Sequence, residues 1–202
     1  MPRLLHIQSS PNLENSISRT LSTEFVEKWV AAHAGTEVEL LDLARRPLPH
    51  WGPEAIGAFA ANGGERSAAE QAAIDLSEKL VRQIEAADIL VIGCPMYNMS
   101  MPTQLKGWID YVSRPGRTLR FTDRTRSQGL IDGKQAFVIL SRGGDYSQPP
   151  FSSSDFQEPL LRTVLGLIGI TDVRFVRAEG QRMQEAPSYI KVARETIDML
   201  AH

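Results

Sequence analysis

Hydroxyl side chains cluster between Ser9 and Ser18, where the sequence reads SSPNLENSIS. The cluster follows the short apolar run LLHI at residues 4–7 and precedes a helical pattern. Free amide groups and the positive end of a helix dipole, about half an elementary charge, together bind anions. Ser10, Ser16 and Ser18 can therefore hold a phosphate group without a lysine. The same serines can also do no more than cap the helix.

The cluster lacks the two common nucleotide-binding motifs. It contains neither the glycine spacing G-x-G-x-x-G of dinucleotide-binding loops nor the G-x-x-x-x-G-K-[ST] pattern of triphosphatases. Each of these motifs uses its glycines to bring the backbone close to a pyrophosphate or triphosphate. A monophosphate therefore fits this loop better than a dinucleotide or a triphosphate.

A second loop, Met96–Met101, follows a strand that is predicted to be buried on both faces. The apolar run ILVI at residues 89–92 is typical of such a strand, and Pro95 marks its end. Pro102 then opens a helical pattern, where its missing amide proton costs nothing. In an open parallel sheet, ligands bind at the carboxyl ends of the strands, where the strand order reverses. We therefore interpret Met96–Met101 as one wall of a ligand site.

A third loop, Ser141–Tyr146, follows the apolar strand pattern at residues 134–140 and contains Gly143 and Gly144. Adjacent glycines allow a backbone to approach a flat ligand, although they also occur in ordinary turns that require positive φ. The second and third loops are expected at the ends of neighbouring strands. Because they would then face each other across one crevice, their occurrence together favours a ligand site.

The single cysteine and the histidines do not predict a nucleophile or a metal centre. A cysteine phosphatase loop has the pattern C-x-x-x-x-x-R, but the sixth residue after Cys94 is Ser100. We interpret Cys94 as a small buried apolar side chain. The four histidines lie at positions 6, 33, 50 and 202, without the spacing of metal ligands, so no metal site is predicted.

Five strand patterns alternate with helical patterns along the chain, which implies parallel strands joined by right-handed crossovers. This arrangement predicts an α/β fold: a flavodoxin-like, doubly wound, parallel five-stranded sheet in the order 2-1-3-4-5, with helices on both faces. The stretch 47–64 has no predicted element, and 114–133 is predicted to be an extended excursion. The strands are expected near residues 4–7, 38–43, 89–94, 134–140 and 173–176, and the helices near 17–30, 65–86, 102–112, 161–168 and 190–200.

Composition limits the class of protein. The chain has 202 residues, 42% of them hydrophobic and 23% charged, which suits one domain spanning 1–202. A formal charge of −2 offers no basic surface for nucleic acid, and one cysteine allows no internal disulfide. We predict neither a signal peptide nor a membrane-spanning segment, since no apolar run approaches ~20 residues. We expect a cytoplasmic protein that binds neither nucleic acid nor a membrane.

Four separated motifs resemble those of the FMN-dependent NADH-azoreductases, which are also NADH:quinone oxidoreductases. The resemblance extends from the first strand to about Gly180, and the motifs keep their order. They are PMYN at 95–98, TQLK at 103–106, SRGG at 141–144 and GITDV at 169–173.

The resemblance implies a role for each loop. Phe121 matches an aromatic position near the substrate, Met99 replaces a frequent phenylalanine, and Leu119 stands where another aromatic residue is common. The backbone amides of Asn98 and Gly143 are expected to tune the flavin. The implied cofactor-binding residues are Ser10, Ser16, Ile17 and Ser18 for the phosphate, Met96, Tyr97, Asn98 and Met99 for the flavin ring, and Ser141, Arg142, Gly143 and Gly144 for its polar edge.

The resemblance also implies an activity, a homodimer and no catalytic side chain. In the implied ping-pong reaction, NADH or NADPH reduces bound FMN, and a quinone or an azo compound then re-oxidises it. The flavin performs the hydride transfer, so no protein residue is predicted to act as acid, base or nucleophile. A non-enzymatic flavodoxin-like electron carrier or interaction protein remains the alternative. Such carriers tend to be strongly acidic, whereas this chain is nearly neutral, which favours an enzyme.

Overall fold

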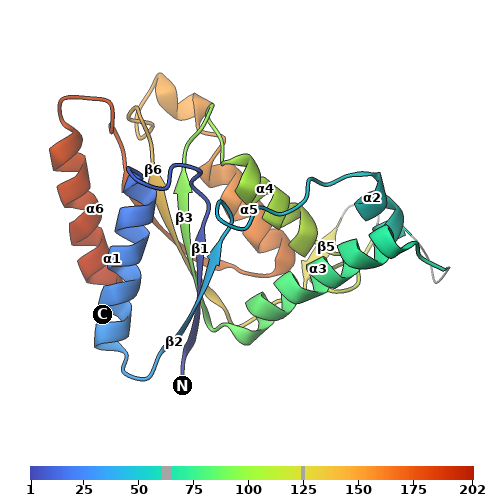
Figure 1. Ribbon diagram of the computed structural model, residues 1–202. Coiled ribbons are helices and arrows are strands. Elements are labelled where there is room, and N and C mark those ends of the chain that lie inside the picture. The colour runs from blue at the N-terminus through green and yellow to red at the C-terminus, as the bar shows by residue number, and fades with distance from the viewer. Residues whose placement is uncertain (61–64, 124–125) are drawn as a thin grey trace.

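A parallel five-stranded sheet forms the centre of the computed structural model, which describes residues 1–60, 65–123 and 126–202 (Figure 1). The strands lie in the order β2-β1-β3-β6-β7. Counting only the strands of this sheet, the predicted order 2-1-3-4-5 is confirmed. The strands are β1 (Arg3–Gln8), β2 (Glu37–Asp42), β3 (Ile89–Pro95), β6 (Gln135–Ser141) and β7 (Asp172–Ala178).

The helices cover both faces of the sheet, as predicted (Figure 1). On one face lie α1 (Ile17–Ala32) and α6 (Ala186–Leu200), and on the other lie α3 (Ala68–Ala86), α4 (Thr103–Val112) and α5 (Glu158–Ile168). Each face has its own hydrophobic core, because side chains of a strand alternate between the two faces. In β3, for example, Val91 packs in the α1 and α6 core, whereas Leu90 and Ile92 pack in the other.

All seven residues of β3 are buried, which explains why the run at 89–92 is apolar on both faces. Gly93 also brings α1 close to this strand. A Cβ atom at Gly93 would lie 2.7 Å from Ser22 Oγ and 3.1 Å from the Ser18 carbonyl oxygen. Glycine at this position therefore lets the first turns of α1 approach the end of β3.

Two stretches are more regular than the sequence predicts. Helix α2 (Pro53–Ala60) lies within the stretch 47–64, of which residues 61–64 are outside the described part of the chain. Trp51, just before this helix, is half-buried between Phe59 and Tyr111, with ring centroids 4.8 and 5.2 Å away. The excursion after α4 contains a small antiparallel hairpin, β4 (Leu119–Phe121) and β5 (Ser127–Gly129). The 3₁₀-helix η1 (Phe151–Ser154) precedes α5.

Candidate functional site

The three predicted ligand loops lie side by side at the carboxyl edge of the sheet. The Ser9 hydroxyl donates to the Gly93 carbonyl at 2.7 Å, which joins the ends of β1 and β3. The Met96 amide donates to the Ser141 carbonyl at 2.8 Å, which joins the ends of β3 and β6. Because β1, β3 and β6 are parallel neighbours, the fold places these loops at one edge.

The first loop forms a compact cradle at the start of α1. Ser16 is the N-cap residue, and its hydroxyl oxygen accepts from the Arg19 amide at 3.4 Å. The hydroxyl groups of Ser16 and Ser18 lie 3.2 Å apart, and the buried Ser10 hydroxyl accepts from the Asn12 amide at 3.3 Å. Capping thus accounts for Ser16 but not for Ser10 or Ser18.

The backbone at the start of α1 adds donors to this cradle. The first amide groups of an α-helix have no intrahelical acceptor, and they include those of Ile17 and Ser18. The Ile17 side chain packs against the core formed with α6, so this residue can serve a ligand only through its backbone. Hydroxyls, helical amides and the helix dipole together suit a phosphate monoester.

The second loop makes a tight turn with a strained backbone. Tyr97 and Ser100 exchange two backbone hydrogen bonds of 2.9 and 3.0 Å, and the two residues between them, Asn98 and Met99, have φ angles of 47° and 67°. Positive φ at both central positions is the pattern of a type I′ turn and is unusual for methionine. Strained residues of this kind cluster at ligand sites. The side chains of Tyr97 and Met99 are 43% and 46% exposed, so apolar surface is available beside the turn.

In the third loop, the backbone conformation does not require glycine at either of the two adjacent positions. Positive φ occurs at other glycines but not at Gly143 or Gly144, so the turn alternative does not explain them. A Cβ atom at Gly144 would make only an ordinary contact with Tyr146 at 3.5 Å, and one at Gly143 would meet the flexible Arg182 side chain at 3.3 Å. No backbone atom blocks either Cβ position, and only flexible or ordinary side-chain contacts are met there, which is compatible with the close approach of a flat ring.

Arg142 is not a surface residue, contrary to what its place in a loop suggests. It is only 2% exposed, and its guanidinium lies 2.8 Å from Glu179 and 2.9 Å from Asp155. It also donates to the side chain of Gln157 at 3.1 Å. Burial raises the pKa of Glu179, although the nearby Arg142 opposes the shift. The side chain of Arg142 therefore stabilises the loop from behind, and its backbone amide donates to the Ala178 carbonyl at 3.0 Å.

Cys94 and His6 are buried and cannot act as nucleophile or acid. Burial raises the pKa of Cys94 to about 12, and its sulfur lies 3.3 Å from the Gln157 side-chain amide. This agrees with the interpretation of Cys94 as a small buried side chain. Burial, reinforced by the charge of Arg19, lowers the pKa of His6 to about 4. Its Nε2 lies 3.1 Å from the Ser22 hydroxyl oxygen, in a neutral hydrogen-bonded position.

Phe121 does not join the three loops within one chain. It lies on the β4–β5 hairpin, 68% exposed, and the hairpin is held at the end of α5 by a 2.9 Å bond from the Ile131 amide to the Ile168 carbonyl. Because β7 begins just after that point, the hairpin lies toward the amino edge of the sheet. Within the described residues, no hydrogen bond or ring contact links Phe121 to the loops. Leu119 is 3% exposed and belongs to the core, so it is not a pocket residue in this chain.

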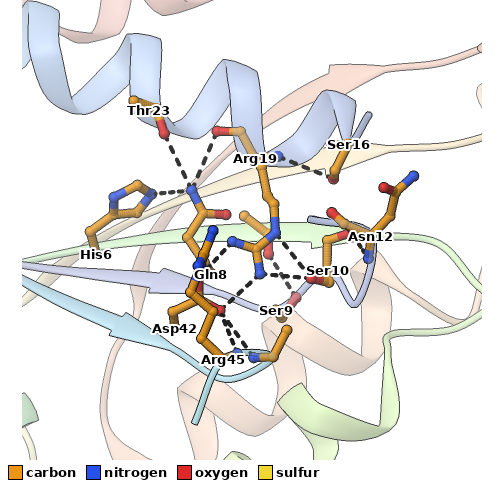
Figure 2. A network of polar contacts seen from close by, with 12 residues as sticks. His6, Gln8, Ser9, Ser10, Asn12, Ser16, Arg19, Thr23, Asp42 and Arg45 are labelled. Atoms are coloured by element: carbon orange, nitrogen blue, oxygen red, sulfur yellow. Dashed lines mark hydrogen bonds and ion pairs between the residues drawn. The ribbon is translucent and has the colours of Figure 1, made fainter. Parts of the chain in front are cut away.

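Two residues that the sequence analysis did not single out stabilise the first loop. Arg19 forms a bidentate ion pair with Asp42 and also donates to the Ser10 carbonyl (Figure 2). A cation in the first turn of a helix opposes the helix dipole, and this local exception could have drawn attention to Arg19. No comparable local signal marks Glu179 or Asp155, the partners of Arg142.

The search for other kinds of site covered the residues that the structure describes. Among them, no group of three or more His, Cys, Asp or Glu side chains is arranged to hold a metal ion. In the same part of the chain, no helix is both long enough and apolar enough to cross a membrane.

Comparison with known proteins assigns the chain to a family. A family model described as a flavodoxin-like fold matches residues 2–200. The chain therefore belongs to the flavodoxin-like fold family, and the predicted fold class is confirmed.

Individual relatives are more specific. An FMN-dependent NADH:quinone oxidoreductase 2 of Pseudomonas fluorescens is 46% identical over 180 residues, covering 89% of this chain and 88% of the relative. An FMN-dependent NADH:quinone oxidoreductase of Polaromonas naphthalenivorans is 45% identical over 203 residues, covering 100% and 93%. The crystal structure of an azoreductase from Bacillus anthracis superposes with a TM-score of 0.92 at 28% identity, covering 100% and 99%. These relatives confirm the resemblance to the FMN-dependent NADH-azoreductases and NADH:quinone oxidoreductases that the four motifs indicated.

Proposed function

We propose that this protein is an FMN-dependent oxidoreductase that transfers electrons in pairs from NADH or NADPH to quinones or azo compounds. The observation that carries the proposal is the meeting of three loops at one edge of the sheet: a serine cradle, a strained turn and a glycine pair. The relatives named FMN-dependent NADH:quinone oxidoreductase and azoreductase support the same activity. The alternative of a non-enzymatic carrier is not favoured.

Each loop has a proposed part in binding FMN. When bound, FMN supplies the redox chemistry by accepting and donating hydride. The cradle provides hydroxyls and helical amides for the phosphate, the strained turn lines the ring, and the third loop offers its backbone to the polar edge. The proposed contacts are Ser10, Ser16, Ile17 and Ser18; Met96, Tyr97, Asn98 and Met99; and Ser141, Arg142, Gly143 and Gly144.

We propose no catalytic acid, base or nucleophile among the protein side chains. The two most suggestive groups, the Cys94 thiol and the His6 imidazole, are buried and neutral at physiological pH. The protein's part is to position rings, to exclude water and to stabilise charge through backbone amides. The amides of Asn98 and Gly143 are proposed to do so.

We propose a homodimer in which the second chain supplies Phe121 to the substrate pocket. Support comes from the 68% exposure of Phe121 and from its place away from the loops of its own chain. Sedimentation that shows a dimer, together with a specific activity that falls when the protein is diluted, would support this arrangement. A monomer with full quinone reductase activity would contradict it. We further propose that the chain forms a single domain over 1–202 and acts in the cytoplasm.

The proposed function is tested by spectroscopy and rapid mixing. Purified protein supplied with FMN is expected to be yellow and to lose its flavin absorbance within one turnover when mixed with NADH or NADPH. Menadione or methyl red should then restore the absorbance. Flavin that binds but is not reduced by either nicotinamide would favour the carrier, and a lack of saturable FMN binding would reject both functions.

A further inference from the structure

We infer that Arg19 and Asp42 act together as positioning residues for the phosphate of FMN. The pair lies behind the loop Ser9–Ser16 and holds it in its binding conformation, without itself being a catalytic group. This inference rests on the proposed function, because it concerns the same site. It adds two residues, one from the first turn of α1 and one from the end of β2.

The contacts tie three elements together at one point (Figure 2). The guanidinium of Arg19 donates from Nη1 and Nη2 to the two carboxylate oxygens of Asp42, each at 2.8 Å. Its Nε and Nη2 also donate to the Ser10 carbonyl oxygen at 3.0 and 2.7 Å. The backbone amides of Ala44 and Arg45 donate to Asp42 Oδ1 at 3.0 and 3.1 Å, so the carboxylate itself is held in place. The side chains of Arg19 and Asp42 are only 14% and 10% exposed.

The position of Arg19 is unfavourable for the helix alone. It is the third residue of α1, and the first turn of this helix contains no acidic residue. A cation at this end opposes the helix dipole by several tenths of a kcal/mol, roughly. The carboxylate of Asp42 offsets that charge, and the hydrogen bonds from Arg19 lower the pKa of Asp42 to about 2, so it stays ionised. The unfavourable interaction of Arg19 with the helix dipole is offset by a carboxylate from β2. This indicates that the arginine serves something other than the helix.

The pair also controls which groups of the loop face an anion. Because two donors of Arg19 hold the Ser10 carbonyl, that partly negative oxygen is turned toward the guanidinium. Without this contact the carbonyl would be free to rotate toward the phosphate and repel it. Loss of Arg19 would also leave the negative charge of Asp42 near the same loop with only the exposed Arg45 side chain beside it. Both effects act on the phosphate and not on the flavin ring.

Paired binding measurements test this inference. The affinities of apoprotein for FMN and for riboflavin, which has the same ring but no phosphate, are measured by quenching of flavin fluorescence. Arg19→Met should weaken FMN binding by about 10-fold to 100-fold, the range expected for losing charge-assisted hydrogen bonds, and change riboflavin binding by less than about twofold. Arg19→Lys should not restore FMN binding, because an ammonium cannot make the bidentate contact.

Arg45→Ala is the matched control. Arg45 lies 3.4 Å from the same carboxylate, but its side chain is 66% exposed and donates no side-chain hydrogen bond to Ser10 among the described contacts. Its loss should change the affinity of either flavin by less than about twofold. In Arg19→Met/Asp42→Asn, removal of the Asp42 carboxylate charge should recover part of the lost FMN affinity.

Several outcomes would overturn the inference. Equal losses of FMN and riboflavin affinity in Arg19→Met would show a general structural role. A loss of FMN affinity in Arg45→Ala as large as that in Arg19→Met would show that positive charge near Asp42, and not the contacts of Arg19, affects binding. If Arg19→Met does not fold, Arg19→Lys is the deciding variant. Unchanged FMN affinity in Arg19→Lys would reject positioning by the bidentate guanidinium contact. Failure of the wild-type protein to bind FMN rejects the proposed function, whereas selective FMN binding that persists in Arg19→Met rejects only the positioning role.

Discussion

Two arginines support the two ends of the candidate site, and they do so in different surroundings. Arg19 has one carboxylate partner and sits at the rim, with 14% of its side chain exposed. Arg142 is 2% exposed and has Glu179, Asp155 and Glu158 within 2.8, 2.9 and 3.8 Å. Removing a cation is most damaging where water cannot solvate the charges left behind. Substitution of Arg142 should therefore destabilise the fold as a substitution in the core does. Substitution at the Arg19 end should mainly change ligand binding and the stability of the protein in acid.

The largest expected effect is at Arg142. Arg142→Met should lower the free energy of unfolding by about 4 kcal/mol, which corresponds to a fall of about 10 °C in Tm, because it leaves buried carboxylates without their cation. Thermal and urea unfolding of the FMN-free protein measure this loss. Arg174→Ala, at a half-exposed ion pair with Asp172, is the control and should change the stability by no more than about 0.5 kcal/mol. A loss at Arg142 as small as that of the control would remove the distinction between the two ends.

The next effect is acid sensitivity at the Arg19 end. Burial lowers the pKa of His6 from 6.5 to about 4, so the folded protein holds this imidazole neutral while the unfolded chain protonates it. Stability from the neutral form is present above pH 6.5 and is lost as the pH falls from 6.5 toward 4, by roughly 3 kcal/mol in total. Urea unfolding across this range should show the slope, and His6→Gln should flatten it. Parallel profiles for the two proteins would assign the slope to other groups.

A smaller loss follows at lower pH, from Asp42. Hydrogen bonds from Arg19 lower its pKa from 3.8 to about 2, so its contribution is present above pH 3.8 and is lost as the pH falls through that interval. The loss should be about 2 kcal/mol and should be absent in Asp42→Asn, as measured by unfolding between pH 4 and 2. Persistence of the full acid transition in that variant would contradict the ion pair as its cause.

The smallest effect concerns the strained turn between the two ends. Met99 has a φ of 67°, and Met99→Gly should raise stability by up to about 1 kcal/mol because glycine adopts this conformation without strain. Asn98→Gly should gain less, since asparagine tolerates the left-handed region better than methionine. Chemical unfolding of both variants measures the difference. A destabilised Met99→Gly would show that side-chain packing at Met99 outweighs its backbone strain.

Part of the site follows from the local sequence. The serine cluster, the turn after Pro95 and the glycine pair each follow a recognisable strand pattern, and parallel topology brings strand ends to one edge. The sequence offers Asn15 or Ser16 as the N-cap of the first helix, and Ser16 is the cap observed. Positive φ at Gly143 and Gly144 is not observed, so the alternative explanation for the glycine pair is the one that fails.

The amino-acid sequence alone determined the alternation of strands and helices, because hydrophobic periodicity reports which side of each element faces the core. It also determined the order of the ligand loops, which follow the strands. Only the tertiary structure decided that Arg142 is buried, that Arg19 meets Asp42 and that Phe121 lies away from the three loops of its own chain. The ion pairs join residues 23 and 37 positions apart, and such contacts depend on which elements the folded sheet brings together. The unfavourable place of Arg19 in the first turn of α1 is a local signal, but no local pattern names Asp42 as its partner or shows that Arg142 is buried.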